Sequence, residues 1–214
     1  MNFFDLKVKE FLDKIDSAAP TPGGGTVSAA AIAFGIGLLR MVAHITLLKK
    51  KFRELPEPAR EDYLKRLARL EEIKNVAILL ADRDSLAFEK IMSAFRLPKE
   101  TDEEKARREE AITIATMEAT EVPLKTARAG LSALETAMPM FFHATKSALS
   151  DFGVGTLLVA AGIEGAVMNV KTNLVSFPDQ EFKEETLREA ESILSRAREM
   201  AADVAGKLEH VFDK

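Results

Sequence analysis

Apolar residues recur at the spacing of an α-helix along almost the whole chain, and this periodicity restricts the fold more than any other feature. The first segment is typical, because Phe4, Val8, Phe11, Leu12 and Ile15 fall on one stripe of a helical wheel. No run alternates apolar and polar residues for long enough to predict a strand, and the residue pairs typical of hairpin turns are missing. The sequence therefore predicts an all-α fold.

Proline and glycine divide this pattern into seven or eight helices, most of them long. We expect helices over residues 4–15, 26–51, 59–96, 102–135, 138–149, 151–174 and 179–212. Pro123 falls inside the fourth segment and predicts a kink there. The sequence contains no low-complexity linker and no internal repeat, so we expect one domain over residues 1–214, a bundle of mostly antiparallel helices.

Composition excludes several functional classes. The formal net charge is -4, which argues against a nucleic-acid partner bound through bulk positive charge. The chain has no cysteine, so thiol catalysis and cysteine-based metal sites are excluded, and three scattered histidines do not suggest a multi-histidine site. We therefore predict no metal and no redox cofactor. The first residues mix acidic and basic side chains, which predicts no secretory signal and a cytosolic location.

Two stretches are nearly free of charge and raise the question of a membrane. Residues 26–39 are too few to span a bilayer. Residues 152–170 are long enough, but they contain Glu164 and Asn169 and are rich in glycine, alanine and valine. Helices buried inside a soluble bundle explain both stretches better, so we expect no membrane contact.

Asp84 is the first candidate for chemistry. At about 100° per residue it lies within about 60° of Ile73, Leu80 and Phe95, whereas Asp82 falls about 160° away. A buried carboxylate needs a partner, and burial raises its pKa, as an acid–base catalyst requires. The alternative is a structural carboxylate at the edge of the apolar stripe, held by an arginine or a helix N-terminus. The sequence favours neither.

Three consecutive glycines, Gly23, Gly24 and Gly25, open the second helix after Pro20 and Pro22. Glycines permit positive φ and leave backbone N–H groups bare at a helix N-terminus, where an anion can bind. The segment is not a P-loop, because the Gly-Lys-Ser/Thr ending is missing. A tight turn between helices is the alternative, but a turn seldom needs three glycines, so we favour close approach of another group to the backbone.

Asn169 and Asn173 are four residues apart and so share one helix face with Leu158, Gly162 and Gly165. Two amides above a floor of small residues predict a hydrogen-bonding pocket for a heterocycle. Close helix packing through the glycines, with the amides bonded to neighbouring backbone, explains the same pattern equally well.

Lys49, Lys50 and Lys51 end the second helix. Cations stabilise the negative end of the helix dipole, which is the simplest explanation for them. They could also hold a polyanionic substrate tail.

Together these segments resemble the cyclodeaminase domain of formiminotransferase-cyclodeaminase and its free-standing relatives, the methenyltetrahydrofolate cyclohydrolases. The matching segments, in order, are residues 20–27, 41–52, 82–88, 97–99, 121–124, 150–155 and 169–174. The triple glycine and the Asn-Val-x-x-Asn-Leu segment are the most specific of them. His44 and Leu48 depart from the pattern, because relatives often carry Asn and Gly there.

The resemblance implies an all-helical domain that forms homodimers, with a folate site near the subunit contact. It implies one of two reactions. The first is ring closure of 5-formiminotetrahydrofolate to 5,10-methenyltetrahydrofolate with loss of ammonia, which we expect here. The second is reversible hydrolysis of methenyltetrahydrofolate to 10-formyltetrahydrofolate. No cofactor is implied beyond the tetrahydrofolate substrate, and a formiminotransferase is an expected partner.

The resemblance and the residue patterns suggest roles for the candidate residues. Asp84 is expected to be the general acid–base, and Asn169 and Asn173 to bind the pterin edge. The glycine turn, with one or more of the lysines at positions 49–51, is expected to hold the glutamate tail of a folate that can be polyglutamylated. Asp151, at the start of a helix, is either an N-cap or a ligand contact. A non-catalytic folate-binding module is the competing class.

Overall fold

The structure is a computed structural model that describes residues 2–212. Within that part of the chain every regular element is helical, and the prediction of an all-α fold is confirmed. The α-helices are α1 (Val8–Ile15), α2 (Gly24–Leu47), α3 (Lys50–Arg53), α4 (Glu57–Phe95), α5 (Asp102–Ala137), α6 (Leu149–Asn173) and α7 (Gln180–Phe212). Three 3-10 helices add η1 (Phe3–Asp5), η2 (Met138–His143) and η3 (Lys146–Ala148).

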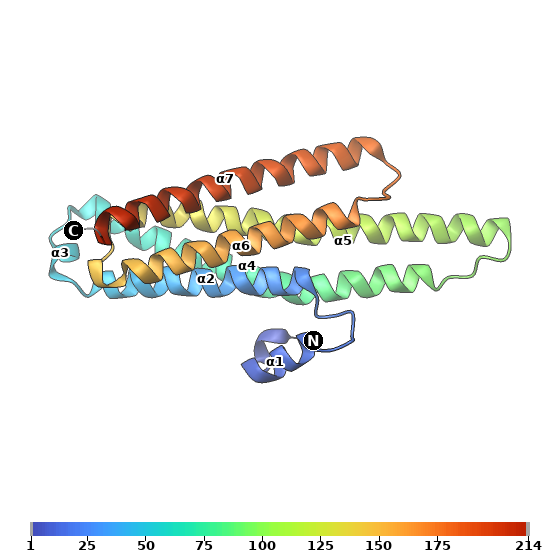
Figure 1. Ribbon diagram of the computed structural model, residues 1–214, viewed down its shortest axis with the longest axis horizontal. Coiled ribbons are helices and arrows are strands. Elements are labelled where there is room, and N and C mark those ends of the chain that lie inside the picture. Colours follow the sequence, from blue (N-terminus) through green and yellow to red (C-terminus); the bar gives the residue numbers. More distant parts are fainter. Residues whose placement is uncertain (1, 213–214) are drawn as a thin grey trace.

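Four long helices, α2, α4, α5 and α6, enclose the core (Figure 1). Each packs against two of the others: α2 against α4 and α6, and α5 likewise against α4 and α6. The core between them is aliphatic, and Ile32, Ile36, Leu70, Leu134 and Ile163 are fully buried. The hairpin of α4 and α5 projects beyond the N-terminus of α2, while α1 lies outside the bundle (Figure 1).

Small residues allow α2 and α6 to run side by side in opposite directions. A Cβ added at Gly35 would lie 2.6 Å from the carbonyl oxygen of Gly155, and one added at Gly162 would lie 2.6 Å from Ile32 Cγ1. Both separations are shorter than real Cβ contacts, so the two helices approach as closely as they do because these side chains are missing. The pairing fixes the register that brings Gly24 to Asn169.

The outermost helix, α7, packs against α5 and α6. Four ion pairs join it to them, namely Arg128–Glu189, Arg196–Glu135, Lys171–Glu191 and Arg198–Glu164. Buried residues of α7 include Ala190, Ile193, Ala197 and Val204, and partly buried apolar residues of the same helix pack against the core. The charged pairs at half-exposed positions add to this apolar contact.

The helix boundaries differ from the sequence prediction in three places. The first expected helix is divided into η1 and α1, and the backbone N–H of Phe3 donates to Asp82 at 2.8 Å. The expected helix 26–51 ends at Leu47, and α3 follows. The expected helix 138–149 consists instead of the short turns η2 and η3, which bury Met140 and Phe141. At Pro123, by contrast, α5 continues without interruption.

Two helical stretches, Gly24–Leu47 and Lys146–Asn173, are long and apolar enough to cross a membrane by length and composition alone. The most apolar window of Gly24–Leu47 is 61% buried inside the bundle, and that of Lys146–Asn173 is 50% buried. Core helices of water-soluble proteins meet the same criteria.

Candidate active site

The glycine segment brings the N-terminus of α2 against the carboxylate of Asp84 on α4. A Cβ added at Gly25 would lie 2.5 Å from Asp84 Cγ and would overlap its oxygens. No described glycine has positive φ, so the glycine segment contributes space rather than an unusual backbone conformation. The expected close approach is present, and the approaching group is a carboxylate of the protein itself.

Asp84 is held by the first turn of α2. The hydroxyl of Thr26 donates to Asp84 Oδ2 at 3.1 Å and also lies 3.1 Å from Ser85 Oγ. Burial raises the pKa of the Asp84 carboxyl above its ordinary value, and hydrogen bonds from the side chain and backbone of Thr26 partly oppose this. Among residues 2–212 no lysine or arginine forms an ion pair with Asp84. The carboxylate is thus held by a helix N-terminus, as one of the two sequence interpretations requires.

Asp84 is less deeply buried than its position on the helical wheel predicts. Its helix stripe is covered at Ile73 and Leu80, but Asp84 is only partly buried, and Phe95, farther along, is 48% exposed. The reason is that α2 begins at Gly24, so the later turns of α4 have no neighbour on that side. Asp84 is therefore partly accessible to solvent.

Asn169 on α6 completes the cluster. Its Nδ2 donates to the carbonyl oxygen of Gly165 at 2.8 Å and lies 3.5 Å from the position of a Cβ at Gly24. Asn173, one turn on, donates from Nδ2 to Ala119 of α5 at 2.9 Å. Both amide nitrogens are thus bonded to backbone, as the packing alternative proposed. Neither amide oxygen accepts a hydrogen bond from the described residues, so both remain able to accept one from a ligand.

Lys49, Lys50 and Asp151 lie at the opposite end of the bundle. Lys49 follows the C-terminus of α2, about 35 Å along the helix from Gly24 at 1.5 Å per residue. Asp151 lies in the first turn of α6, about 27 Å from Asn169 by the same measure. The N-cap of α6 is Ala148, so Asp151 is not an N-cap. Within one chain, these three residues do not join the cluster.

Hydroxyl groups are the part of the site that sequence reasoning missed. Thr26 and Ser85 are buried beside Asp84, and Ser28 donates to the carbonyl oxygen of Gly24 at 2.7 Å. Two of them directly follow residues that the sequence did single out, Gly25 and Asp84. That adjacency was the available signal.

The arrangement is suited to moving a proton. A carboxyl with a raised pKa exchanges its proton more readily near neutral pH than an ordinary one. The hydroxyl and the backbone N–H of Thr26, in the first turn of α2, bind this carboxyl, and Asn169 of α6 lies beside the nearby Gly24. Within residues 2–212 no cluster of potential metal ligands is present.

The family described as formiminotransferase-cyclodeaminase has a model that matches residues 7–192 of this chain. The methenyltetrahydrofolate cyclohydrolase of Methylorubrum extorquens is 36% identical over 190 residues, which cover 89% of each chain. The formimidoyltransferase-cyclodeaminase of Mus musculus is 34% identical over 209 residues, which cover 97% of this chain but 38% of that protein.

A solved structure shows the same fold. The crystal structure of formiminotetrahydrofolate cyclodeaminase from Thermotoga maritima superposes with a TM-score of 0.84 and 27% sequence identity. The superposition covers 97% of this chain and 98% of that chain.

Proposed function

The chain belongs to the formiminotransferase-cyclodeaminase family, whose cyclodeaminases and cyclohydrolases act in folate one-carbon metabolism, and we propose that it is a formimidoyltetrahydrofolate cyclodeaminase, an ammonia-lyase. It would convert 5-formiminotetrahydrofolate to 5,10-methenyltetrahydrofolate and ammonia. The observation that carries this proposal is the partly buried carboxylate of Asp84, held by the N-terminus of α2 next to the glycine that contacts Asn169.

Ring closure requires a proton to move between two nitrogens. N10 of the folate attacks the formimino carbon, here an amidinium, and forms a tetrahedral carbon that carries an amino group. The proton of N10 passes to Asp84, which returns it to the amino group, and ammonia leaves as the methenyl cation forms. Burial raises the pKa of this carboxyl above its ordinary value, which makes it a better proton donor and acceptor for both transfers than an ordinary carboxyl.

Asn169 and Asn173 would orient the pterin through their free amide oxygens, which can accept hydrogen bonds from its N–H edge. The missing Cβ at Gly25 lets Asp84 lie directly against the first turn of α2, and Asn169 lies beside Gly24. Holding N10 against the formimino carbon in this way supplies the orientation on which an intramolecular closure depends.

A homodimer would complete the site. On α2 and its C-cap, partly exposed apolar residues recur every seven positions: Val27, Phe34, Met41 and Leu48 are 37%, 52%, 38% and 73% exposed. Val27 and Phe34 also face the N-terminal segment, where the ring centroids of Phe34 and Phe4 are 6.1 Å apart. The adjacent face of α6 exposes Val154, Leu157 and Met168. An isologous contact through these faces, with each α2 antiparallel to its copy, brings the lysine end of one protomer to the glycine end of the other. Lys49 and Lys50 would then reach the glutamate tail of a folate bound by the partner, and Asp151, at the same end of the bundle, would be a further ligand contact.

The second candidate reaction is methenyltetrahydrofolate hydrolysis. It is favoured by the relative from Methylorubrum extorquens, a cyclohydrolase that matches this chain over 89% of both lengths. Water would attack the methenyl carbon and give the same kind of tetrahedral centre, with Asp84 as the base.

For the cyclodeaminase reaction, a formiminotransferase in the same cytosolic compartment would supply the 5-formiminotetrahydrofolate.

The test follows methenyl absorbance. Wild-type protein incubated with 5-formiminotetrahydrofolate should produce a rise that Asp84→Asn abolishes and the matched variant Asp82→Asn retains. Folate binding without a rise would contradict the proposal and indicate a binding module. Consumption of methenyltetrahydrofolate, with no conversion of the formimino compound, would establish the cyclohydrolase instead.

A further inference from the structure

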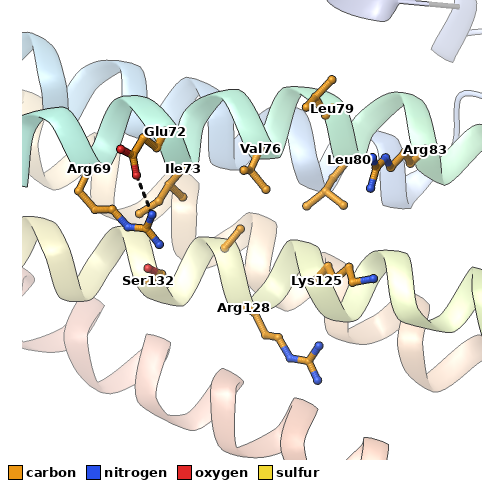
Figure 2. Close-up of a pocket in the computed structure, with 11 residues that line it drawn as sticks. Arg69, Glu72, Ile73, Val76, Leu79, Leu80, Arg83, Lys125, Arg128 and Ser132 are labelled. Atoms are coloured by element: carbon orange, nitrogen blue, oxygen red, sulfur yellow. Dashed lines mark hydrogen bonds and ion pairs between the residues drawn. The ribbon is translucent and has the colours of Figure 1, made fainter.

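A groove of about 480 Å³ opens between α4 and α5 (Figure 2). Its floor is apolar and includes Ile73, Leu80 and Ala129, with Val76 and Leu79 at its edge. Val76 and Leu79 are 47% and 56% exposed, on the outward side of a long helix where polar residues are expected. The groove therefore offers an apolar surface that the fold itself leaves uncovered.

Cations outnumber anions around this floor. The lining residues include Arg69 and Arg83 from α4 and Lys125 and Arg128 from α5, but only one acid, Glu72. Two of the cations are occupied. Arg69 donates to Glu72 at 2.7 Å, and Arg128 binds both carboxylate oxygens of Glu189 on α7, at 2.6 and 2.7 Å.

The other two cations are less fully paired. Arg83 forms no ion pair with any residue in the described range 2–212. Lys125 is 3.4 Å from Glu121, a carboxylate that also accepts from Arg128 at 3.1 Å. Figure 2 shows Arg83 and Lys125 on opposite walls at the same end of the groove. Two donors that face each other beside an apolar floor match a ligand with one anionic group and an apolar body.

We propose that this groove binds an aromatic organic anion, with its carboxylate, sulfonate or phosphate between Arg83 and Lys125 and its rings on Val76, Leu79 and Leu80. Flat rings fit the floor, and guanidinium groups stack on aromatic faces. The site is separate from the catalytic cluster. Arg83 precedes Asp84 in sequence, but successive residues point about 100° apart around a helix, so one faces α5 and the other α2.

The experiment compares two fluorescent dyes, the anionic 1-anilinonaphthalene-8-sulfonate and its uncharged analogue N-phenyl-1-naphthylamine. The double variant Arg83→Ala/Lys125→Ala should weaken saturable binding of the anionic dye about ten-fold or more and leave the neutral dye unchanged. The control Lys105→Ala/Arg107→Ala removes the same charge from exposed positions of α5 and should change neither. Circular dichroism of both variants verifies folding.

Three results would overturn the proposal. Equal binding of the anionic dye by the wild type and the Arg83/Lys125 variant would show that these cations bind no anion. An equal loss in the control would show only a response to net charge. Stoichiometric displacement of the dye by tetrahydrofolate would show that the groove belongs to the catalytic site.

Discussion

Asp84 combines an unfavourable environment with a position that a catalyst needs. Burial disfavours its charged form, and no cation compensates for this among the described residues. Only Thr26 and the helix N-terminus stabilise the carboxylate. If position 84 served structure alone, asparagine, which carries no charge, would stabilise the fold more than aspartate.

Asp84→Asn should therefore remove activity and increase stability at neutral pH. General acid–base groups contribute about 100-fold or more to turnover, so kcat should fall by at least that factor. Because the native pKa is raised, the folded wild type binds more protons than the unfolded chain, and its stability falls as pH rises through the raised pKa.

Thermal melts from acid to neutral pH provide the check. The gain in stability of Asp84→Asn over the wild type should be absent in acid, where Asp84 is protonated in both the folded and the unfolded wild type. This gain should grow as pH rises. A variant less stable than wild type at neutral pH would show that the carboxylate is structural.

Gly25→Ala should disrupt the same site from the opposite side. Its methyl group would overlap the Asp84 carboxylate, so we expect a loss of about 1–3 kcal/mol of unfolding free energy and of most activity. Gly206→Ala is the matched control, because a Cβ there meets nothing within 4 Å. It should stabilise α7 by about 0.5–1 kcal/mol. Urea unfolding measures both changes, and similar effects of the two variants would disprove the steric explanation.

At the scale of the elements, the pairing of α2 with α6 positions the site. Gly162→Ala places a methyl group 2.6 Å from both Ile32 Cγ1 and the carbonyl oxygen of Ser28. Backbone cannot yield as a flexible side chain can, so α6 should move away from α2 and shift Asn169. We expect weaker folate binding together with lower stability in urea. Ala161→Ser, at the adjacent exposed position, should change neither; unchanged binding in Gly162→Ala would remove this role for the pairing.

The sequence predicted the long helices well because each of them carries its own periodic stripe. It failed at residues 138–149, where a short apolar run is compatible with a helix or with the observed 3-10 turns. It identified Asp84, Gly25 and Asn169 by residue type, but not their mutual contacts, which depend on the register of α2 with α4 and α6. The separation of Lys49 and Asp151 from that cluster, about 35 Å and about 27 Å, follows from the lengths of α2 and α6. The antiparallel packing of the two helices places both residues at the same end of the bundle.

At the scale of the whole molecule, the outward face of α2 and α6 is the prediction that matters most. Met41→Asp combined with Leu157→Asp should convert the proposed dimer to a monomer, because both residues are exposed and apolar on that face. Leu64→Asp, at a 50% exposed position of α4, is the matched control and should leave the mass unchanged. Sedimentation measures the result, and a wild-type monomer would refute the dimer outright.

Mixing two impaired variants tests whether the site is shared. If Lys49 and Lys50 serve the partner, a heterodimer of Asp84→Asn with Lys49→Glu/Lys50→Glu contains one intact site. Activity on low concentrations of polyglutamylated folate should then exceed that of either variant alone after subunit exchange. No recovery would show that the lysines do not serve the site of the partner.

The ion pairs between α7 and its neighbours α5 and α6 determine which part of the molecule unfolds first at high salt. Salt screens the half-exposed charges of these pairs, and the Debye length falls from about 8 Å at 0.15 M to about 3 Å at 1 M. The aliphatic core that residues 2–212 form between α2, α4, α5 and α6 contains no such charges and stays intact. A concentrated chloride buffer should thus loosen the outermost helix first, and amide exchange would record this as early deuterium uptake confined to residues 180–212. High salt would then release α7 from the bundle of α2, α4, α5 and α6, two parts that heating unfolds together.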